Sequence, residues 1–202
     1  SSRATGSRHD GPRKVPTMMP PQPNDAHLVE TELATQTTFE GRLLVIRTDR
    51  IRLPDGAEAA REYVSHPGAA LIVPVLPDGR FVLERQYRYP VRRVMLEFPA
   101  GKIDPGEKSL ATAQRELREE AGYTAGKWSS LGTIHPEIGY SDEFIDVYEA
   151  TDLVHVGQAL DDGEFLEIVT MTEEELLVTY DCGGFTDGKS IAAYFAWKRR
   201  RG

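Results

Sequence analysis

The sequence lacks the features that mark several classes of protein. It has a single cysteine, Cys182, so it can form neither an internal disulfide nor a cysteine-rich zinc site, and a reducing compartment is expected. No apolar run approaches the roughly 20 residues that a membrane-spanning helix requires. The 24 basic residues are outnumbered by 32 acidic ones, and the net charge of −8 argues against a nucleic-acid-binding surface. We therefore expect a cytoplasmic protein with neither a membrane nor a nucleic acid as its partner.

The composition is typical of a globular domain that follows a tail. Hydrophobic residues make up 40% of the chain and charged residues 28%, which is enough to build a core. Residues 1–26 hold five of the 13 prolines and no apolar periodicity, so we expect a disordered tail there and one domain over residues 27–202. Met18 and Met19 leave two possibilities for the residues before them, an upstream extension or a vector-derived remnant.

Turn residues and apolar patterns predict the elements of this domain. Two Leu-Pro-Asp-Gly sequences, at 53–56 and 76–79, predict hairpin connections because Pro presets the backbone and Gly supplies a positive φ. Strand-like runs cover residues 43–53, 61–65, 69–75, 81–87, 96–98, 128–134, 144–149 and 166–171.

Three helices are predicted. Apolar residues at helical spacing predict one from Ser109 to Ala121, which Gly122 ends. Thr172 and Glu175 form a capping box that opens a second helix, reaching about residue 180. A last helix follows, with Asp187 or Ser190 as its cap.

The first helix carries a cluster of acids. Glu116, Glu119 and Glu120 fall within an arc of roughly 100° on its surface and border its apolar face. Three crowded carboxylates repel one another unless a cation lies among them, and such hard oxygen ligands suit Mg²⁺ or Mn²⁺. A bare Glu-x-x-Glu-Glu sequence is most often a solvated helix face. The surrounding residues are therefore needed to distinguish a metal site from such a face.

That segment is GKIDPGEKSLATAQRELREEAGY, from Gly101 to Tyr123. It matches the Nudix box, Gly-x5-Glu-x7-Arg-Glu-U-x-Glu-Glu-x-Gly-U with U a bulky apolar residue, at every specified position. The chain therefore resembles a Nudix hydrolase. The resemblance implies an α/β fold, the Nudix α/β/α sandwich with a mixed β-sheet plus N-terminal antiparallel strands. It also implies hydrolysis of a nucleoside diphosphate derivative with Mg²⁺, or Mn²⁺, as cofactor.

Outside the box, the chain is most similar to the ADP-ribose pyrophosphatase branch of the family. The similar stretches are 61–62, 66–68, 86–88, 96–101, 139–143, 161–167 and 187–193. This likeness implies a homodimer that hydrolyses ADP-ribose to AMP and ribose 5-phosphate. Ile138 departs from the branch, which usually has a proline 16 residues after the last glycine of the box. Two alternatives stay open: another nucleoside diphosphate sugar as substrate, or a sensor that binds ADP-ribose or NAD without cleaving it.

The resemblance also implies metal ligands. Glu116 and Glu120 would be the principal ones, joined by Glu119 and by the backbone carbonyl of Ala100. Arg115 would orient these carboxylates, so that Glu119 and Arg115 count among the catalytic residues.

Further roles follow for residues around the box. Glu107, Gly101 and Gly122 would brace the loop against the helix. Glu164, in an acidic segment, would be the catalytic base, with Glu167 as the alternative. Four residues would contact substrate: Arg61, Arg88, Glu97 and Glu143. Phe39 could stack on adenine, but as a lone aromatic residue it is better interpreted as part of the core.

Overall fold

The computed structural model describes residues 25–160 and 162–201. Residues 1–24 of the expected tail lie outside the described residues, so the tail stays a prediction. The described chain divides into two compact units, one with residues 25–35 and 49–61 and the other with residues 36–48 and 62–201. Each unit is described by itself below.

The first three strands form a sheet in the order β1-β2-β3. They are β1 (Thr31–Glu40), β2 (Val45–Arg52) and β3 (Glu58–Ser65). The turn predicted at 53–56 is confirmed, because the Leu53 amide donates to the Ala57 carbonyl at 2.8 Å. All but one of the β1 side chains are exposed, and Phe39 among them is 53% exposed. The interpretation of Phe39 as a core residue was therefore wrong.

Two further sheets build the larger unit. One has the order β7-β4-β9-β8 and the other the order β10-β5-β6. Their strands are β4 (Ala69–Pro74), β5 (Phe81–Arg88), β6 (Arg93–Glu97), β7 (Ala100–Lys102), β8 (Tyr123–Ile134), β9 (Ile145–His155) and β10 (Leu166–Met171). β4 runs parallel to β9, whereas the other pairs in these two sheets are antiparallel. The predicted mixed sheet is thus confirmed.

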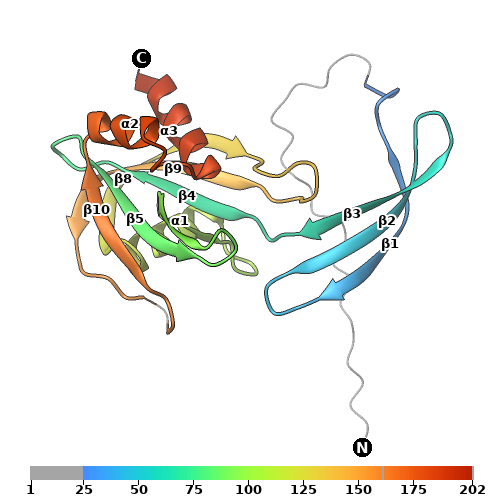
Figure 1. The fold of residues 1–202 in the computed structure, drawn as a ribbon, viewed down its shortest axis with the longest axis horizontal. Helices are drawn as coiled ribbons and strands as arrows, with labels where there is room; N and C mark the ends of the chain where they lie inside the picture. Colours follow the sequence, from blue (N-terminus) through green and yellow to red (C-terminus); the bar gives the residue numbers. More distant parts are fainter. Residues whose placement is uncertain (1–24, 161, 202) are drawn as a thin grey trace, which may run out of the picture. The chain divides into compact units, whose positions relative to one another are not determined.

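Helices cover both sides of β4, whose six residues are all buried. Leu71 and Val73 belong to one core cluster, which also holds Trp197 of α3 (Gly188–Arg201). Ala70 and Ile72 alternate with them and pack with α1 (Ser109–Glu119) in a second cluster. α2 (Glu173–Asp181) joins α3 on its side, opposite α1 (Figure 1). This is the predicted α/β/α sandwich.

The helix signals in the sequence are mostly confirmed. The capping box of α2 is present in both directions between Thr172 and Glu175. Asp187, not Ser190, caps α3: its carboxylate accepts from the Ser190 amide at 3.1 Å. The Ser190 hydroxyl is buried and accepts from the Phe98 amide at 2.8 Å instead. Within the described ranges, no helix is long and apolar enough to cross a membrane.

Several strands differ from the expectation. The turn at 76–79 is present, but only Val75 and Phe81 pair before their strands enter different sheets. β8 and β9 are longer than predicted because their ladder continues as far as Tyr123 opposite His155. The short β7 was not predicted at all, since it is a strand only through its pairing with β4.

Candidate active site

The acids of α1 lie at the edge of the core because the helix is amphipathic. Thr112, Ala113 and Leu117 are its buried residues. Glu120 follows the last turn and is 6% exposed, and the side chain of Glu116 is 12% exposed. The predicted position of these carboxylates at the rim of the core is therefore observed.

β7 passes directly against these acids. A Cβ atom built on Gly101 would fall well inside contact distance of the Glu116 carboxylate, so the close approach requires glycine. The neighbouring Ala100 amide donates to Glu120 Oε2 at 3.2 Å. The backbone of β7 thus forms one wall of the site.

Arg115 ties the preceding loop to the helix. Its Nη1 donates to Glu116 Oε1 at 2.6 Å and to Glu119 Oε2 at 3.3 Å. Its Nη2 donates to Glu107 Oε2 at 3.1 Å and to the Lys102 carbonyl at 3.2 Å. Hydrogen bonds from Arg115 and Thr112 lower the pKa of Glu107 to about 2. Glu107 therefore stays ionised and holds Arg115 beside the carboxylates.

Negative charge at the site exceeds what Arg115 can balance. Burial is the main cause of the raised pKa of Glu116. Burial first, and then the charges of Glu84, Glu116 and Glu164, raise the pKa of Glu120 to about 10. The site therefore favours any bound species that brings positive charge.

These groups converge on one acidic cavity of about 220 Å³. Its walls are formed by Gln86, Arg88, Ala100, Gly101, Arg115, Glu116, Glu119, Glu120 and Glu164. The structure thus gathers residues from β5, β7 and α1, and from the acidic segment after β9. Every predicted metal ligand lies on this wall, as do Arg88 and the predicted base Glu164.

Arg88 is held in place from behind. Its Nε and Nη2 bond the two oxygens of Glu97 at 2.7 and 2.9 Å. Lys189 at the start of α3 also donates to Glu97 and, at 2.8 Å, to Asp187. Burial raises the pKa of Glu97, but the hydrogen bonds from Arg88 and Lys189 outweigh burial and leave the pKa lowered. Glu97, only 2% exposed, therefore contacts Arg88 and not the cavity.

Three other predicted residues are not among those that line the cavity in the described chain. Glu143 lies beside His66, with its carboxylate 3.7 Å from Nδ1. Glu167 is in β10, where it pairs with Arg85 at 2.6 Å. Arg61 belongs to the smaller unit, where it pairs with Glu30. Gly122 follows the end of α1 with φ +75°, a left-handed conformation that favours glycine, and its bracing role stays a prediction.

Three residues in or beside the site were not predicted as site residues: Gln86 on the cavity wall, and Lys189 and Glu84 next to it. Lys189 gave no signal beyond a polar residue near a helix start. Glu84 did give one: it is an acid in the otherwise apolar strand sequence Phe-Val-Leu-Glu, and it is fully buried. An acid at a buried strand position is unusual enough to be noticed.

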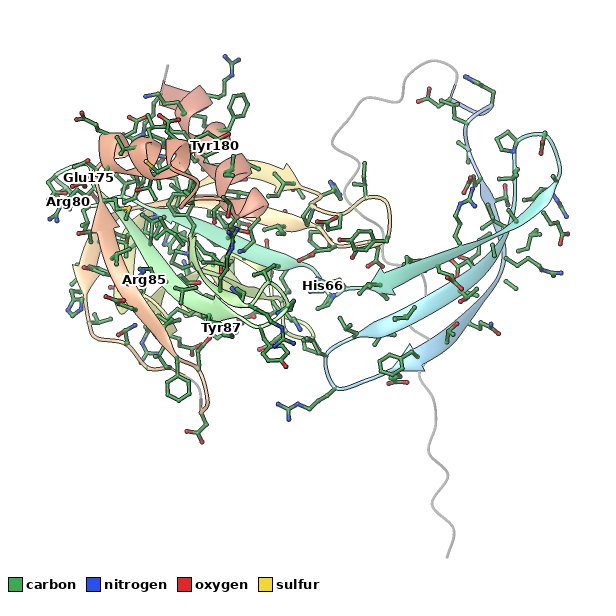
Figure 2. The ribbon with its side chains drawn as sticks, viewed as in Figure 1. His66, Arg80, Arg85, Tyr87, Glu175 and Tyr180 are labelled. Carbon is green, nitrogen blue, oxygen red and sulfur yellow. The ribbon has the colours of Figure 1, made fainter. Side chains whose placement is uncertain are left out.

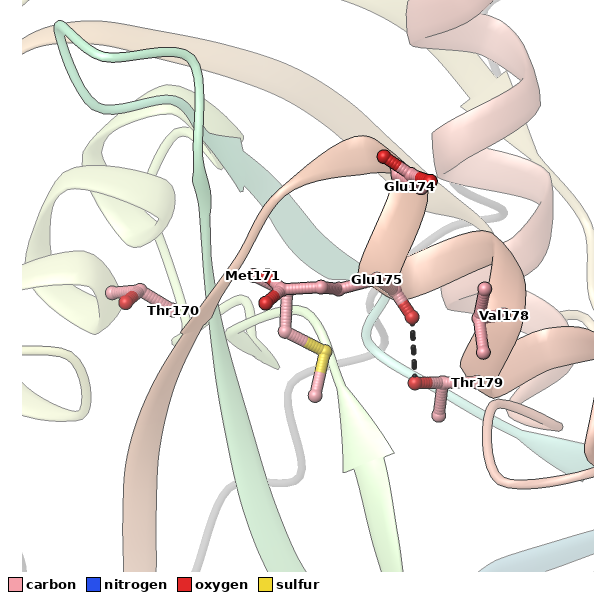
Figure 3. Close-up of a pocket in the computed structure, with 6 residues that line it drawn as sticks. All are labelled: Thr170, Met171, Glu174, Glu175, Val178 and Thr179. Atoms are coloured by element: carbon pink, nitrogen blue, oxygen red, sulfur yellow. Dashed lines mark hydrogen bonds between the residues drawn. The ribbon is translucent and has the colours of Figure 1, made fainter.

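A larger hollow of about 490 Å³ lies over α2 (Figure 3) and is lined by Thr170, Met171, Glu174, Glu175, Val178 and Thr179. Glu175 is engaged in the capping box, and Thr179 donates to the Glu175 carbonyl at 2.7 Å. No cluster of titratable groups converges there among the described lining residues, so the acidic cavity is the candidate active site.

Comparison with known proteins agrees with this geometry. The family model described as the NUDIX domain matches residues 65–193, which include the whole acidic cavity. The chain belongs to the Nudix family. The resemblance carried by the segment from Gly101 to Tyr123 is thereby confirmed.

Several relatives align with most of the chain. The ADP-ribose pyrophosphatase of Bacillus subtilis (strain 168) is 34% identical over 168 residues, which are 82% of this chain and 91% of that protein. The methanol dehydrogenase activator of Bacillus methanolicus is 34% identical over 166 residues, 81% of this chain and 90% of that protein. A crystal structure titled ADP compounds hydrolase matches with a TM-score of 0.75 and 25% identity, over 84% of this chain and 92% of that one.

Nudix proteins generally use divalent metal ions, and the residues present fit one. The cavity offers carboxylates and a backbone carbonyl, the oxygen donors that such ions prefer, and its four glutamates outnumber its two arginines. As the side chains stand, no group of three or more His, Cys, Asp and Glu in the described chain is arranged as a metal site. Glu116 is bonded to Arg115 instead, so an ion would exchange with this guanidinium contact.

Proposed function

We propose that this Nudix protein hydrolyses the pyrophosphate bond of ADP-ribose, giving AMP and ribose 5-phosphate, with Mg²⁺ or Mn²⁺ as cofactor. The observation that carries the proposal is the acidic cavity, where three carboxylates, two arginines and Glu164 converge. The names of the relatives support the substrate, since one is an ADP-ribose pyrophosphatase and the matching structure is an ADP compounds hydrolase.

In this proposal Glu116 and Glu120 hold the cation, with Glu119 and the Ala100 carbonyl as further oxygen ligands. When bound, the ion neutralises phosphate charge and makes a coordinated water more acidic. Arg115 keeps the carboxylates in position through its contacts to Glu116 and Glu119.

The remaining residues on the wall act on substrate and water. Arg88, fixed by Glu97, donates charge-assisted hydrogen bonds to a phosphate oxygen. Glu164 accepts the proton of the attacking water. Its place on the cavity wall supports it over Glu167, which is exposed and paired with Arg85. The oxygen of that water forms the new bond to phosphorus, and the phosphate on the other side leaves.

Another nucleoside diphosphate sugar is the alternative substrate. Ile138, in place of the proline expected of the ADP-ribose branch, is 84% exposed and favours this alternative. A sensor that binds without cleaving is disfavoured by the complete set of acids, since binding alone does not require them.

A panel of substrates tests the proposal. We would incubate the protein and Mg²⁺ with ADP-ribose, ADP-glucose and GDP-mannose, and identify products by chromatography. We expect the highest kcat/KM with ADP-ribose, and AMP as one product. A preference for another sugar nucleotide would establish the alternative substrate class, and binding without turnover would establish the sensor.

We further propose a cytoplasmic homodimer in which Arg61 completes the substrate site. Large apolar side chains are exposed on and beside the first strands, as in an interface: Leu28, Val29, Phe39, Leu43 and Leu44. Light scattering should give twice the mass of one chain. Arg61→Ala should raise KM for ADP-ribose, and a monomer with unchanged KM would refute this part.

A further inference from the structure

Glu84 is a buried acid that the proposed mechanism does not use. It follows Phe81, Val82 and Leu83 in β5, and all four residues are fully buried. Neither oxygen of the Glu84 carboxyl group has a hydrogen-bond partner in the described chain. Burying an unpaired acid is costly, and an apolar side chain would continue the strand at no such cost. A side chain that lowers the stability of the fold in this way is expected to serve a function.

The position of Glu84 relates it to the acidic cavity. Alternate residues of a strand share a face, so Glu84 lies on the same face of β5 as Gln86 and Arg88, which line the cavity. Arg85 and Tyr87 alternate with them (Figure 2) and are exposed. Glu84 is therefore the next residue inward along the cavity-lining face.

Among the residues that the structure describes, the neighbours of Glu84 supply negative charge and no free cation. The residue of β6 that pairs with Glu84 is Glu97. The nearby cations Arg88 and Lys189 both bond the Glu97 carboxylate. Val82, two residues earlier on the same face of β5, packs in one core cluster with Leu117 and Ala121, which flank the acids of α1. The charge of Glu84 is accordingly the largest cause after burial of the raised pKa of Glu120. A cation placed between Glu84 and Glu120 would satisfy both carboxylates.

We propose that Glu84 is a further carboxylate ligand of the divalent cation, supplied from the buried position of β5 that lies next inward from the cavity-lining residues Gln86 and Arg88. This inference rests on the proposed function, which places the cation at Glu116 and Glu120. A fourth acid strengthens cation binding and weakens the fold while the cation is absent.

Binding of Mn²⁺ alone tests this proposal without any substrate. Free Mn²⁺ would be followed by electron paramagnetic resonance in titrations of the wild type, Glu84→Gln, Glu84→Leu and the control Glu174→Gln. Glu174 lies on α2 (Figure 3) and is not among the residues that line the acidic cavity. We expect about a tenfold or greater rise in Kd for both Glu84 variants and none for the control. An unchanged Kd in both Glu84 variants would overturn the proposal.

Thermal melting gives a second readout. Without Mn²⁺, both Glu84 variants should melt at a higher temperature than the wild type, and saturating Mn²⁺ should raise the melting temperature less in them. An equal rise in all proteins would also overturn the proposal. Glu120→Gln separates the role of Glu84 from the proposed cation site itself. If Glu120→Gln weakens Mn²⁺ binding and the Glu84 variants do not, only the role of Glu84 fails. If it too binds Mn²⁺ as the wild type does, the proposed cation site fails.

Discussion

Gly101 illustrates how strongly the site depends on single residues. Its missing side chain leaves the space that the Glu116 carboxylate occupies. Gly101→Ala should therefore displace Glu116 and lower kcat/KM by about 10²-fold, the cost of a misplacement of about 1 Å. Steady-state kinetics with ADP-ribose measures this effect.

Gly188→Ala is the matched control, because a Cβ at Gly188 would meet no atom within 4 Å apart from its chain neighbours and the backbone of its own helix. It should keep the activity of the wild type, and both variants should give the circular dichroism spectrum of the wild type. Full activity in Gly101→Ala would show that the approach of β7 to Glu116 is not needed for turnover.

The identity of the general base can also be tested with single substitutions. Glu164→Gln should lower kcat by roughly 10²–10⁴-fold with a much smaller change in KM, because a general base acts in the transition state. Glu167→Gln should have a mild effect, since Glu167 is in an ion pair with Arg85.

A Mg²⁺ titration separates the roles open to Glu164. Partial rescue of Glu164→Gln by excess Mg²⁺ would make it a ligand and not the base. A severe effect of Glu167→Gln alone would move the base to β10. Mild effects at both positions would remove this acidic segment from the mechanism.

At the scale of elements, the end of α1 fixes where Glu120 lies. Gly122 has φ +75°, and a Cβ there would lie 2.9 Å from the backbone nitrogen of Gln158. The Gln158 side chain in turn donates to the Glu120 carbonyl at 2.7 Å. Gly122→Ala should lower the free energy of unfolding by roughly 1–3 kcal/mol because of this backbone strain and crowding. Urea denaturation checks the value, and a change below about 0.5 kcal/mol would contradict the argument.

The elements also show what the sequence could predict. α1 and its acids were predictable because an eleven-residue amphipathic helix carries its own periodic pattern. The three residues of β7 carry no such pattern, and β1 has few apolar residues to alternate. Contacts between distant segments, such as Lys189 with Glu97, depend on how the tertiary fold places the start of α3 beside the end of β6. The residues that line the acidic cavity were therefore predictable apart from Gln86, but the groups that support Arg88 were not.

At the scale of the whole molecule, the site makes part of the stability depend on pH. Hydrogen bonds from Arg115 and Thr112 lower the pKa of Glu107 to about 2, against 4.5 in an unperturbed side chain. Below pH 4.5 Glu107 becomes protonated in the unfolded chain, whereas in the folded chain it stays ionised down to about pH 2. The stabilisation is therefore complete above pH 4.5 and is lost as the pH falls toward 2.

Glu107→Gln should lack this contribution. The difference in unfolding free energy between wild type and variant should be largest near pH 6 and shrink toward pH 2. Denaturant titrations at several pH values measure it, and a difference that does not vary with pH would contradict the assigned pKa shift.

The central proposal is that the acidic cavity directs water onto a phosphorus atom of ADP-ribose. Hydrolysis in H₂¹⁸O with Mg²⁺, followed by mass spectrometry of the products, tests this claim most directly. We predict AMP and ribose 5-phosphate, with one ¹⁸O in the phosphate of only one of them. We also predict a loss of turnover of about 10²-fold or more in Glu120→Gln. Release of free ADP, label in neither phosphate, or full activity in Glu120→Gln would contradict the account.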